Sequence, residues 1–130
     1  MMTRLGIDAQ SRIIDVHEMT VDAVGRWDVV LFLGVFYHLL DPIDALRRLA
    51  AITTEVLVLE THLDLQDLGR PAMVFYPSRK PGGNETNWWG PNRTCVEGLL
   101  RVVGFPEVSF TQHPSAGPGR GIFHAYKSTK

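Results

Sequence analysis

The chain has 130 residues, which is enough for one domain with a buried core. A net charge of −1 disfavours nucleic acid and anionic membranes as partners, and no apolar run reaches the roughly 20 residues of a membrane span. The single Cys95 excludes an internal disulfide and, with no signal-peptide pattern, indicates a cytoplasmic protein.

Two strands are predicted in the first part of the chain. Residues 12–17 predict a short strand that ends in polar side chains. Residues 27–33 form an apolar run broken only by Asp28, which is typical of a parallel strand buried on both faces. Gly34 then ends this run, so the side chains that follow lie beyond the carboxyl end of the strand.

A helix and a third strand follow. Residues 42–52 carry apolar side chains at helical spacing, with Asp41 as the expected N-cap and Pro42 at the first helical position. Residues 55–60 predict the next buried strand. Two strands joined by one helix of this length predict a right-handed parallel βαβ unit.

Residues 63–91 show no clear periodicity and contain several prolines and glycines. Loops of this length in a compact domain are usually lids or disordered, and the aromatic side chains here argue against disorder. We therefore predict a lid over residues 63–91, with Trp89 in its own apolar cluster.

The last part predicts a helix and an antiparallel hairpin. Thr94 and Glu97 have the spacing of a capping box, and Gly104 is expected to end the helix. Cys95 would lie in the first helical turn, which would lower its pKa. Residues 108–112 and 121–127 predict two strands joined by a short turn rich in Gly and Pro.

Three stretches resemble the class I S-adenosylmethionine-dependent methyltransferases: residues 28–42, 59–61 and 87–105. The Gly-Val-Phe-Tyr-His core that begins at Gly34 is most similar to the branch containing the tRNA wobble-uridine carboxymethyltransferase. The resemblance runs from about Arg12 to Lys127 and maps onto the later part of the family's domain.

The family's sheet has the strand order 3-2-1-4-5-7-6, with the seventh strand antiparallel. The resemblance implies that its third to seventh strands correspond, in chain order, to residues 12–16, 27–33, 55–60, 108–112 and 121–127. The first two strands and the glycine-rich cofactor turn have no counterpart. We therefore expect one incomplete α/β domain over residues 1–130: a partial Rossmann-like methyltransferase sheet with a parallel βαβ unit, a C-terminal antiparallel hairpin and an open slot.

The resemblance implies a site for S-adenosylmethionine, or for a carboxylated analogue, at the carboxyl ends of the strands. The end of the third strand would meet adenine, the turn after residue 33 would line the methionine end, and an arginine that opens the last strand would hold the analogue's carboxylate. The implied cofactor residues are Asp15, Val16, His17, Leu33, Gly34, Tyr37 and Arg120. The alternatives are solvated turns for Asp15–His17 and Arg120, and core positions for Leu33 and Tyr37.

The acceptor is expected near the end of strand 55–60 and under the lid, at Glu60, His62, Tyr76, Asn87 and Trp88. His38 is the candidate catalytic residue, as a general base or as a buried histidine that orients the turn. The histidines lack the spacing of metal ligands, so no metal site is expected.

Two hypotheses on function stay open at this point. The first is methyl transfer to a small or medium acceptor molecule. The second is a non-catalytic methyltransferase-like fragment or binding partner that cannot hold the cofactor alone. Under both hypotheses the chain could form a homo-oligomer or bind a complementing chain, because either partner could fill the slot in the sheet.

Overall fold

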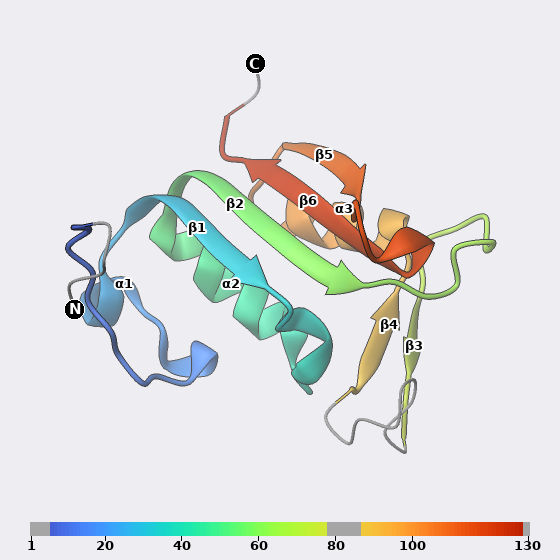
Figure 1. Cartoon of the computed structure of the whole chain (residues 1–130), viewed down its shortest axis with the longest axis horizontal. Coiled ribbons are helices and arrows are strands. Elements are labelled where there is room, and N and C mark those ends of the chain that lie inside the picture. Colours follow the sequence, from blue (N-terminus) through green and yellow to red (C-terminus); the bar gives the residue numbers. More distant parts are fainter. Residues whose placement is uncertain (1–5, 78–86, 129–130) are drawn as a thin grey trace.

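The computed structural model describes residues 6–77 and 87–128 (Figure 1). Four strands form one mixed sheet in the order β1-β2-β6-β5, and β3 pairs with β4 in a separate hairpin. The elements in chain order are η1 (Val16–Glu18), α1 (Val21–Val24), β1 (Trp27–Leu33), η2 (Phe36–His38), α2 (Pro42–Ile52), β2 (Thr53–His62), β3 (Met73–Phe75), β4 (Trp89–Pro91), α3 (Arg93–Val103), β5 (Glu107–Gln112), η3 (Gly117–Gly119) and β6 (Arg120–Tyr126).

The predicted parallel βαβ unit is confirmed. β1 pairs with β2 in parallel, and Leu33 lies opposite Glu60, so both strands end at the same edge of the sheet. The crossover helix α2 begins as expected, because the Asp41 carboxylate accepts a hydrogen bond from the Asp44 amide at 3.1 Å and Pro42 fills the first turn.

The predicted C-terminal hairpin is also confirmed, with β6 antiparallel to both β2 and β5. The start of α3 differs from the prediction, because its N-cap is Asn92 and not the expected box from Thr94. The Asn92 amide oxygen accepts from the Cys95 amide at 3.0 Å, and Glu97 pairs with Arg93 at 3.1 Å. Gly104 ends the helix with φ 127°, a conformation that favours glycine.

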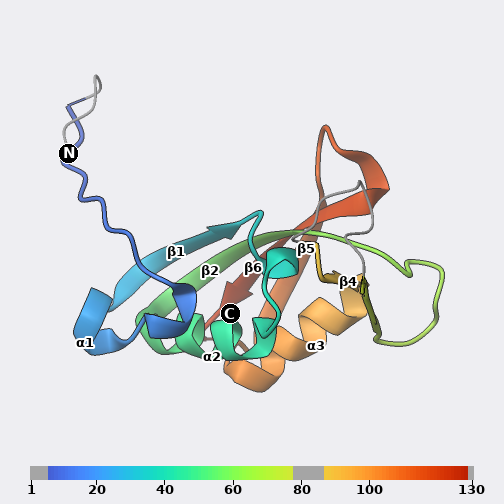
Figure 2. The ribbon, with the colours of Figure 1, turned by 90° about the horizontal axis from the view of Figure 1, so that it is seen from below.

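The core lies between the sheet and one layer of helices, because α2 and α3 both pack on the same face (Figure 2). The apolar stripes of the two helices form one layer of this core, and alternating residues of the strands form the other. Its fully buried members include Leu46, Leu49, Ile52, Leu57, Leu59, Val96, Leu100, Phe105 and Phe123. Within the described part of the chain, no helix is long and apolar enough to cross a membrane.

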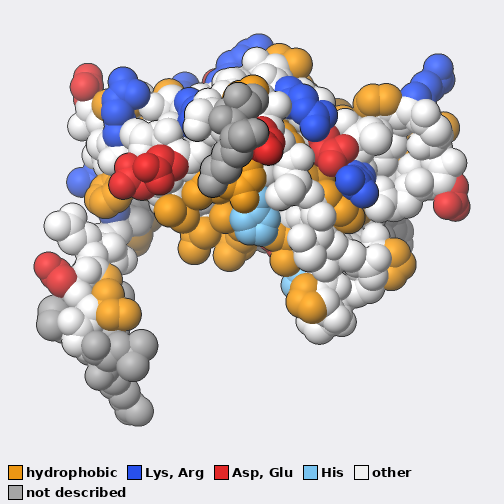
Figure 3. Space-filling model, turned by 90° about the horizontal axis from the view of Figure 1, so that it is seen from above, with side chains coloured by type: hydrophobic (Ala, Val, Ile, Leu, Met, Phe, Trp, Pro, Cys, Tyr) orange, Lys and Arg blue, Asp and Glu red, His pale blue; other side chains and the backbone are white. Residues whose placement is uncertain are grey.

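The opposite face of β1 is bare, and the prediction that this strand is buried on both faces is wrong. Phe32 points to the helices and is 6% exposed. The alternate side chains point the other way and are 51–63% exposed: Trp27, Val29, Leu31 and Leu33. The physical reason is topology, since β1 is an edge strand and no described element covers this face. Figure 3 shows hydrophobic side chains gathered along one side of the molecule.

The predicted strand over residues 12–16 is also wrong. The Asp15 carboxylate accepts from the His17 amide at 2.8 Å and starts the 3-10 helix η1, which turns the chain. His17 Nδ1 lies 2.8 Å from the Asp44 carboxylate, so this segment packs against α2. A strand needs a neighbour to pair with, and the described sheet ends at β1 on this side.

The predicted lid contains a short antiparallel hairpin, β3–β4. Trp88 joins it to η2, because its amide donates to the Tyr37 carbonyl at 2.8 Å while its carbonyl accepts from the Tyr76 amide at 2.7 Å. Phe75 stacks near Trp88 and Trp89, with ring centroids 6.3 and 5.1 Å away. The apolar cluster predicted around Trp89 is present, and residues 78–86 of the predicted lid lie outside the described residues.

Candidate functional site

Three polar side chains meet where β1 and β2 end. Arg120, the first residue of β6, binds the Glu60 carboxylate with two nitrogens, at 2.5 Å from Nε and 2.9 Å from Nη2. The same Nη2 donates to the Tyr37 hydroxyl at 3.0 Å. Glu60 first, and then Tyr37, raise the pKa of Arg120, so the guanidinium stays charged. We call this group the Glu60–Arg120–Tyr37 cluster.

Gly34 brings the backbone close to this cluster. Its φ of +70° is rare for residues with a side chain, and its amide donates to the Glu60 carbonyl at 3.0 Å. A Cβ at this position would lie 3.7 Å from Glu60 Oε1 and 3.8 Å from the Tyr37 hydroxyl. The glycine therefore keeps open a space at the strand end that a side chain would enter.

A second polar group adjoins the first. His62, the last residue of β2, has Nε2 3.1 Å from the Tyr76 hydroxyl, which donates to the Asp64 carboxylate. Burial and the bond to Asp64 raise the pKa of the Tyr76 phenol. The His62 and Tyr37 rings lie 6.1 Å apart at their centroids, so the two groups form one continuous polar site.

Burial is the main cause that lowers the pKa of His62, and the Arg120 charge lowers it further. The Asp64 carboxylate and a backbone hydrogen bond to Gly119 act in the opposite direction but are outweighed. The imidazole is therefore neutral at neutral pH, which leaves it able to accept a proton.

This pKa shift predicts a pH-dependent stability. The unfolded state takes up the His62 proton first, at about pH 6.5, so the stability that the neutral ring contributes is present above that pH. It is lost as the pH falls through the lower pKa of the folded state. We expect urea unfolding to show a larger loss between neutral and mildly acidic pH for the wild type than for His62→Gln. Equal losses in both proteins would contradict this account of His62.

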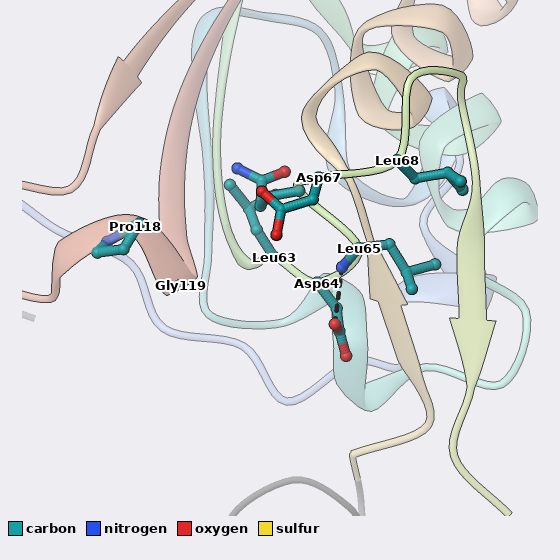
Figure 4. Close-up of a pocket in the computed structure, with 8 residues that line it drawn as sticks. Leu63, Asp64, Leu65, Asp67, Leu68, Pro118 and Gly119 are labelled. Carbon is teal, nitrogen blue, oxygen red and sulfur yellow. Dashed lines mark hydrogen bonds between the residues drawn. The ribbon is translucent and has the colours of Figure 1, made fainter.

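An open hollow of about 720 Å³ lies beside the polar site (Figure 4). It is bounded by residues 63–68, which follow β2, and by the turn at Pro118 and Gly119. Asp64 belongs to both features, because one of its oxygens accepts from the Leu65 amide at 2.7 Å and the other from Tyr76. A molecule in this hollow would therefore lie next to the His62 group.

The structure brings together seven of the predicted site residues: Leu33, which lies opposite Glu60 in the sheet, and Gly34, Tyr37, Glu60, His62, Tyr76 and Arg120. His38 lies on the edge of this site, with its ring centroid 4.3 Å from that of Tyr37. Asn87 and Trp88 lie at the start of the β4 side of the hairpin, where Trp88 faces Phe75. Asp15, Val16 and His17 lie at η1 against α2 instead, so their predicted place at a strand end is wrong.

Asp64 is the site residue that the sequence analysis missed. Glu60, His62 and Asp64 alternate along the chain, and this period of two was the signal that could have identified it. The prediction for Cys95 is also wrong, since burial raises the pKa of its thiol. Among residues 6–77 and 87–128, no three His, Cys, Asp or Glu side chains are placed to hold a metal ion.

No family model matches the sequence, and no curated protein matches it. Several solved structures share the fold. The N-terminal domain of EvdMO1, crystallised with SAH and D-fucose, matches 91% of this chain at 21% identity with a TM-score of 0.64. Magnesium protoporphyrin IX methyltransferase (ChlM) from Synechocystis PCC 6803, with bound SAH, matches 88% at 18% identity with a TM-score of 0.60.

A third structure, 1,6-didemethyltoxoflavin-N1-methyltransferase from Burkholderia thailandensis, matches 89% of the chain at 19% identity with a TM-score of 0.58. The chain therefore has an α/β methyltransferase fold. It spans about half the length of these three structures: 54%, 49% and 49%.

Proposed function

We propose that this chain takes part in methyl transfer from S-adenosylmethionine to a small or medium acceptor. The observation that carries the proposal is the polar site at the carboxyl ends of β1 and β2, beside an open hollow. In open α/β sheets, ligands bind at this end of the strands. The proposal is supported by structures of the same fold whose crystals held SAM or SAH.

The residues present suit a sulfonium donor. Leu33 offers an exposed apolar surface, Gly34 leaves room for the backbone to approach, and Tyr37 offers a hydroxyl that Arg120 holds in place. The donor would supply an activated methyl group on a positively charged sulfur. Because such a transfer depends mainly on alignment, the role of these side chains is to orient the donor toward the hollow.

An acceptor that attacks through a hydroxyl or amine must also lose a proton. His62 is our first candidate for the base, since burial lowers its pKa and keeps the ring neutral. The Tyr76 hydroxyl gives its proton to Asp64, so Nε2 donates to that hydroxyl and Nδ1 is the nitrogen that would accept the proton. His38 is the second candidate, because it lies against Tyr37.

We propose the hollow of residues 63–68 for the acceptor. Asn87 and Trp88 do not line this hollow and stay candidates for a contact from the start of β4.

We further propose that the donor is plain S-adenosylmethionine. The Gly-Val-Phe-Tyr-His core supports a relation to the wobble-uridine branch, where an arginine would hold an extra carboxylate. Here Glu60 already binds Arg120 through both of its oxygens. A carboxylated donor would have to displace Glu60 from the guanidinium, at the cost of a paired, partly buried charge.

Titration calorimetry with S-adenosylhomocysteine tests this proposal. We expect the wild-type chain to bind with micromolar affinity and Gly34→Ala to bind at least about tenfold more weakly. Gly104→Ala is the matched control. Both glycines have positive φ, 70° at Gly34 and 127° at Gly104, so alanine strains the backbone at both positions. A Cβ at Gly104 meets nothing within 4 Å, whereas a Cβ at Gly34 faces the cluster.

No heat of binding by the wild type up to millimolar ligand would overturn the proposal. That result would favour the alternative of a methyltransferase-like chain that cannot hold the cofactor alone. If Gly34→Ala and Gly104→Ala weakened the binding of S-adenosylhomocysteine equally, the chain would still bind the cofactor. The proposed location of the cofactor site, at the end of β1, would then be wrong.

A further inference from the structure

Tyr76 lies between a histidine and an aspartate, and its hydroxyl contacts both of them. The residue directly follows β3 and is 8% exposed. Its hydroxyl donates to Oδ2 of Asp64 and lies 3.1 Å from Nε2 of His62. A hydroxyl has one hydrogen, so Tyr76 can donate to only one of these two neighbours.

The number of hydrogens fixes the direction of both bonds. A carboxylate can only accept, whereas a neutral imidazole has one nitrogen that donates and one that accepts. Burial and the bond to Asp64 raise the pKa of Tyr76, so the phenol keeps its hydrogen at neutral pH. With that hydrogen on Asp64, the phenol oxygen accepts from Nε2–H of His62. The three groups thus form a chain of hydrogen bonds that runs in one direction, from His62 through Tyr76 to Asp64.

We propose that Asp64 and Tyr76 are positioning residues that hold His62 in its Nε2–H tautomer and leave Nδ1 as the basic nitrogen. This inference rests on the proposed function, in which His62 takes a proton from the acceptor. In that step an O–H or N–H bond of the acceptor breaks, its electron pair stays on the acceptor atom, and the proton binds Nδ1. If the Asp64 carboxylate were absent, the Tyr76 hydroxyl could donate to Nε2, and Nδ1 would then carry the hydrogen of the ring.

The same chain suits the ring after it has taken the proton. A charged imidazole donates from both nitrogens, so its Nε2–H bond to Tyr76 is kept. Burial lowers the pKa of His62, and the negative charge of Asp64 acts against this effect by favouring the charged ring. Asp64 also lines the hollow, where its other oxygen accepts from the Leu65 amide at 2.7 Å (Figure 4). The residue that orients the base is therefore part of the wall of the proposed acceptor site.

Nitrogen-15 NMR of the His62 ring tests this inference, at neutral pH and without cofactor. The chemical shifts of the two ring nitrogens show which of them carries the hydrogen. We expect Nε2–H to outnumber Nδ1–H by at least about tenfold in the wild type, because the other tautomer leaves Nε2 and the phenol oxygen as two acceptors without a hydrogen between them. In Asp64→Ala the Tyr76 hydroxyl can donate to Nε2, so the ratio should reverse in favour of Nδ1–H.

Asp67→Ala is the matched control. Asp67 is a second aspartate that lines the hollow, but the Tyr76 hydroxyl bonds Asp64 and His62 instead. This variant removes the same charge and should keep the wild-type ratio of tautomers. The double variant Asp64→Ala/Tyr76→Phe should show no reversal, because the reversal needs the hydroxyl of Tyr76. A reversal that persists in the double variant would contradict the role of Tyr76.

A wild type in the Nδ1–H form would overturn the inference, and so would a folded Asp64→Ala variant that keeps Nε2–H. Circular dichroism establishes that each variant is folded. If Asp64→Ala does not fold, Tyr76→Phe decides: a mixture of both tautomers supports the inference, and an unchanged ratio overturns it. Because the NMR measurement uses no cofactor, it can fail while the chain binds S-adenosylhomocysteine, and the proposed function is then left standing without this role of Asp64.

Discussion

Replacing Gly90 with alanine is expected to destabilise the protein by about 2–4 kcal/mol and to dismantle the His62 group. Gly90 lies in β4, directly against the Tyr76 ring. An added Cβ would lie 2.0 Å from the Tyr76 hydroxyl, 2.7 Å from its Cζ and 2.8 Å from the Asp64 Cβ. Tyr76 would have to move, and its hydrogen bonds to Asp64 and His62 would be lost. Urea unfolding measures the stability, and the NMR titration of His62 reports its surroundings.

Gly98→Ala is the matched control for this substitution. Gly98 lies inside α3, and a Cβ there meets nothing within 4 Å. Alanine is the better helix former, so this variant should be more stable by up to about 1 kcal/mol. The two Gly→Ala changes are thus expected to have opposite signs. If Gly90→Ala left the stability unchanged, the packing of Tyr76 on β4 would be wrong.

Phe123→Ala is expected to cost about 3–5 kcal/mol, which is a large part of the stability of a domain this size. Phe123 is the central residue of β6 and is fully buried between β2 and β5. Its ring meets that of Phe110 edge to face, with centroids 5.1 Å apart. The truncation would leave a cavity under α2 and α3 that neighbouring side chains can fill only in part.

The control for Phe123→Ala is Val102→Ala, which removes apolar atoms from an exposed site. We expect a change within about 0.5 kcal/mol, because Val102 is 81% exposed. Denaturant midpoints of both variants against the wild type give the comparison. A loss below about 1 kcal/mol for Phe123→Ala would contradict the position of β6 at the centre of the sheet.

Local sequence determined most elements of the sheet and its helices. The apolar run of residues 27–33, the capped helix at Pro42 and the glycine stop at Gly104 all form where they were predicted. Each of these signals acts over a few residues: burial period, a capping carboxylate, or a backbone angle that favours glycine. The family resemblance added the pairing order, which local signals do not contain.

Tertiary structure decided which faces and which partners these elements have. The composition of β1 indicates two buried faces, but burial also requires neighbouring elements. Among the described residues no element covers the second face of β1, so its side chains are exposed. The strand expected over residues 12–16 became a capped turn against α2, because a strand forms only where a pairing edge is available. Likewise, Glu60, Tyr37 and Arg120 are far apart in sequence. They meet only because β1, β2 and β6 bring them to one edge of the sheet.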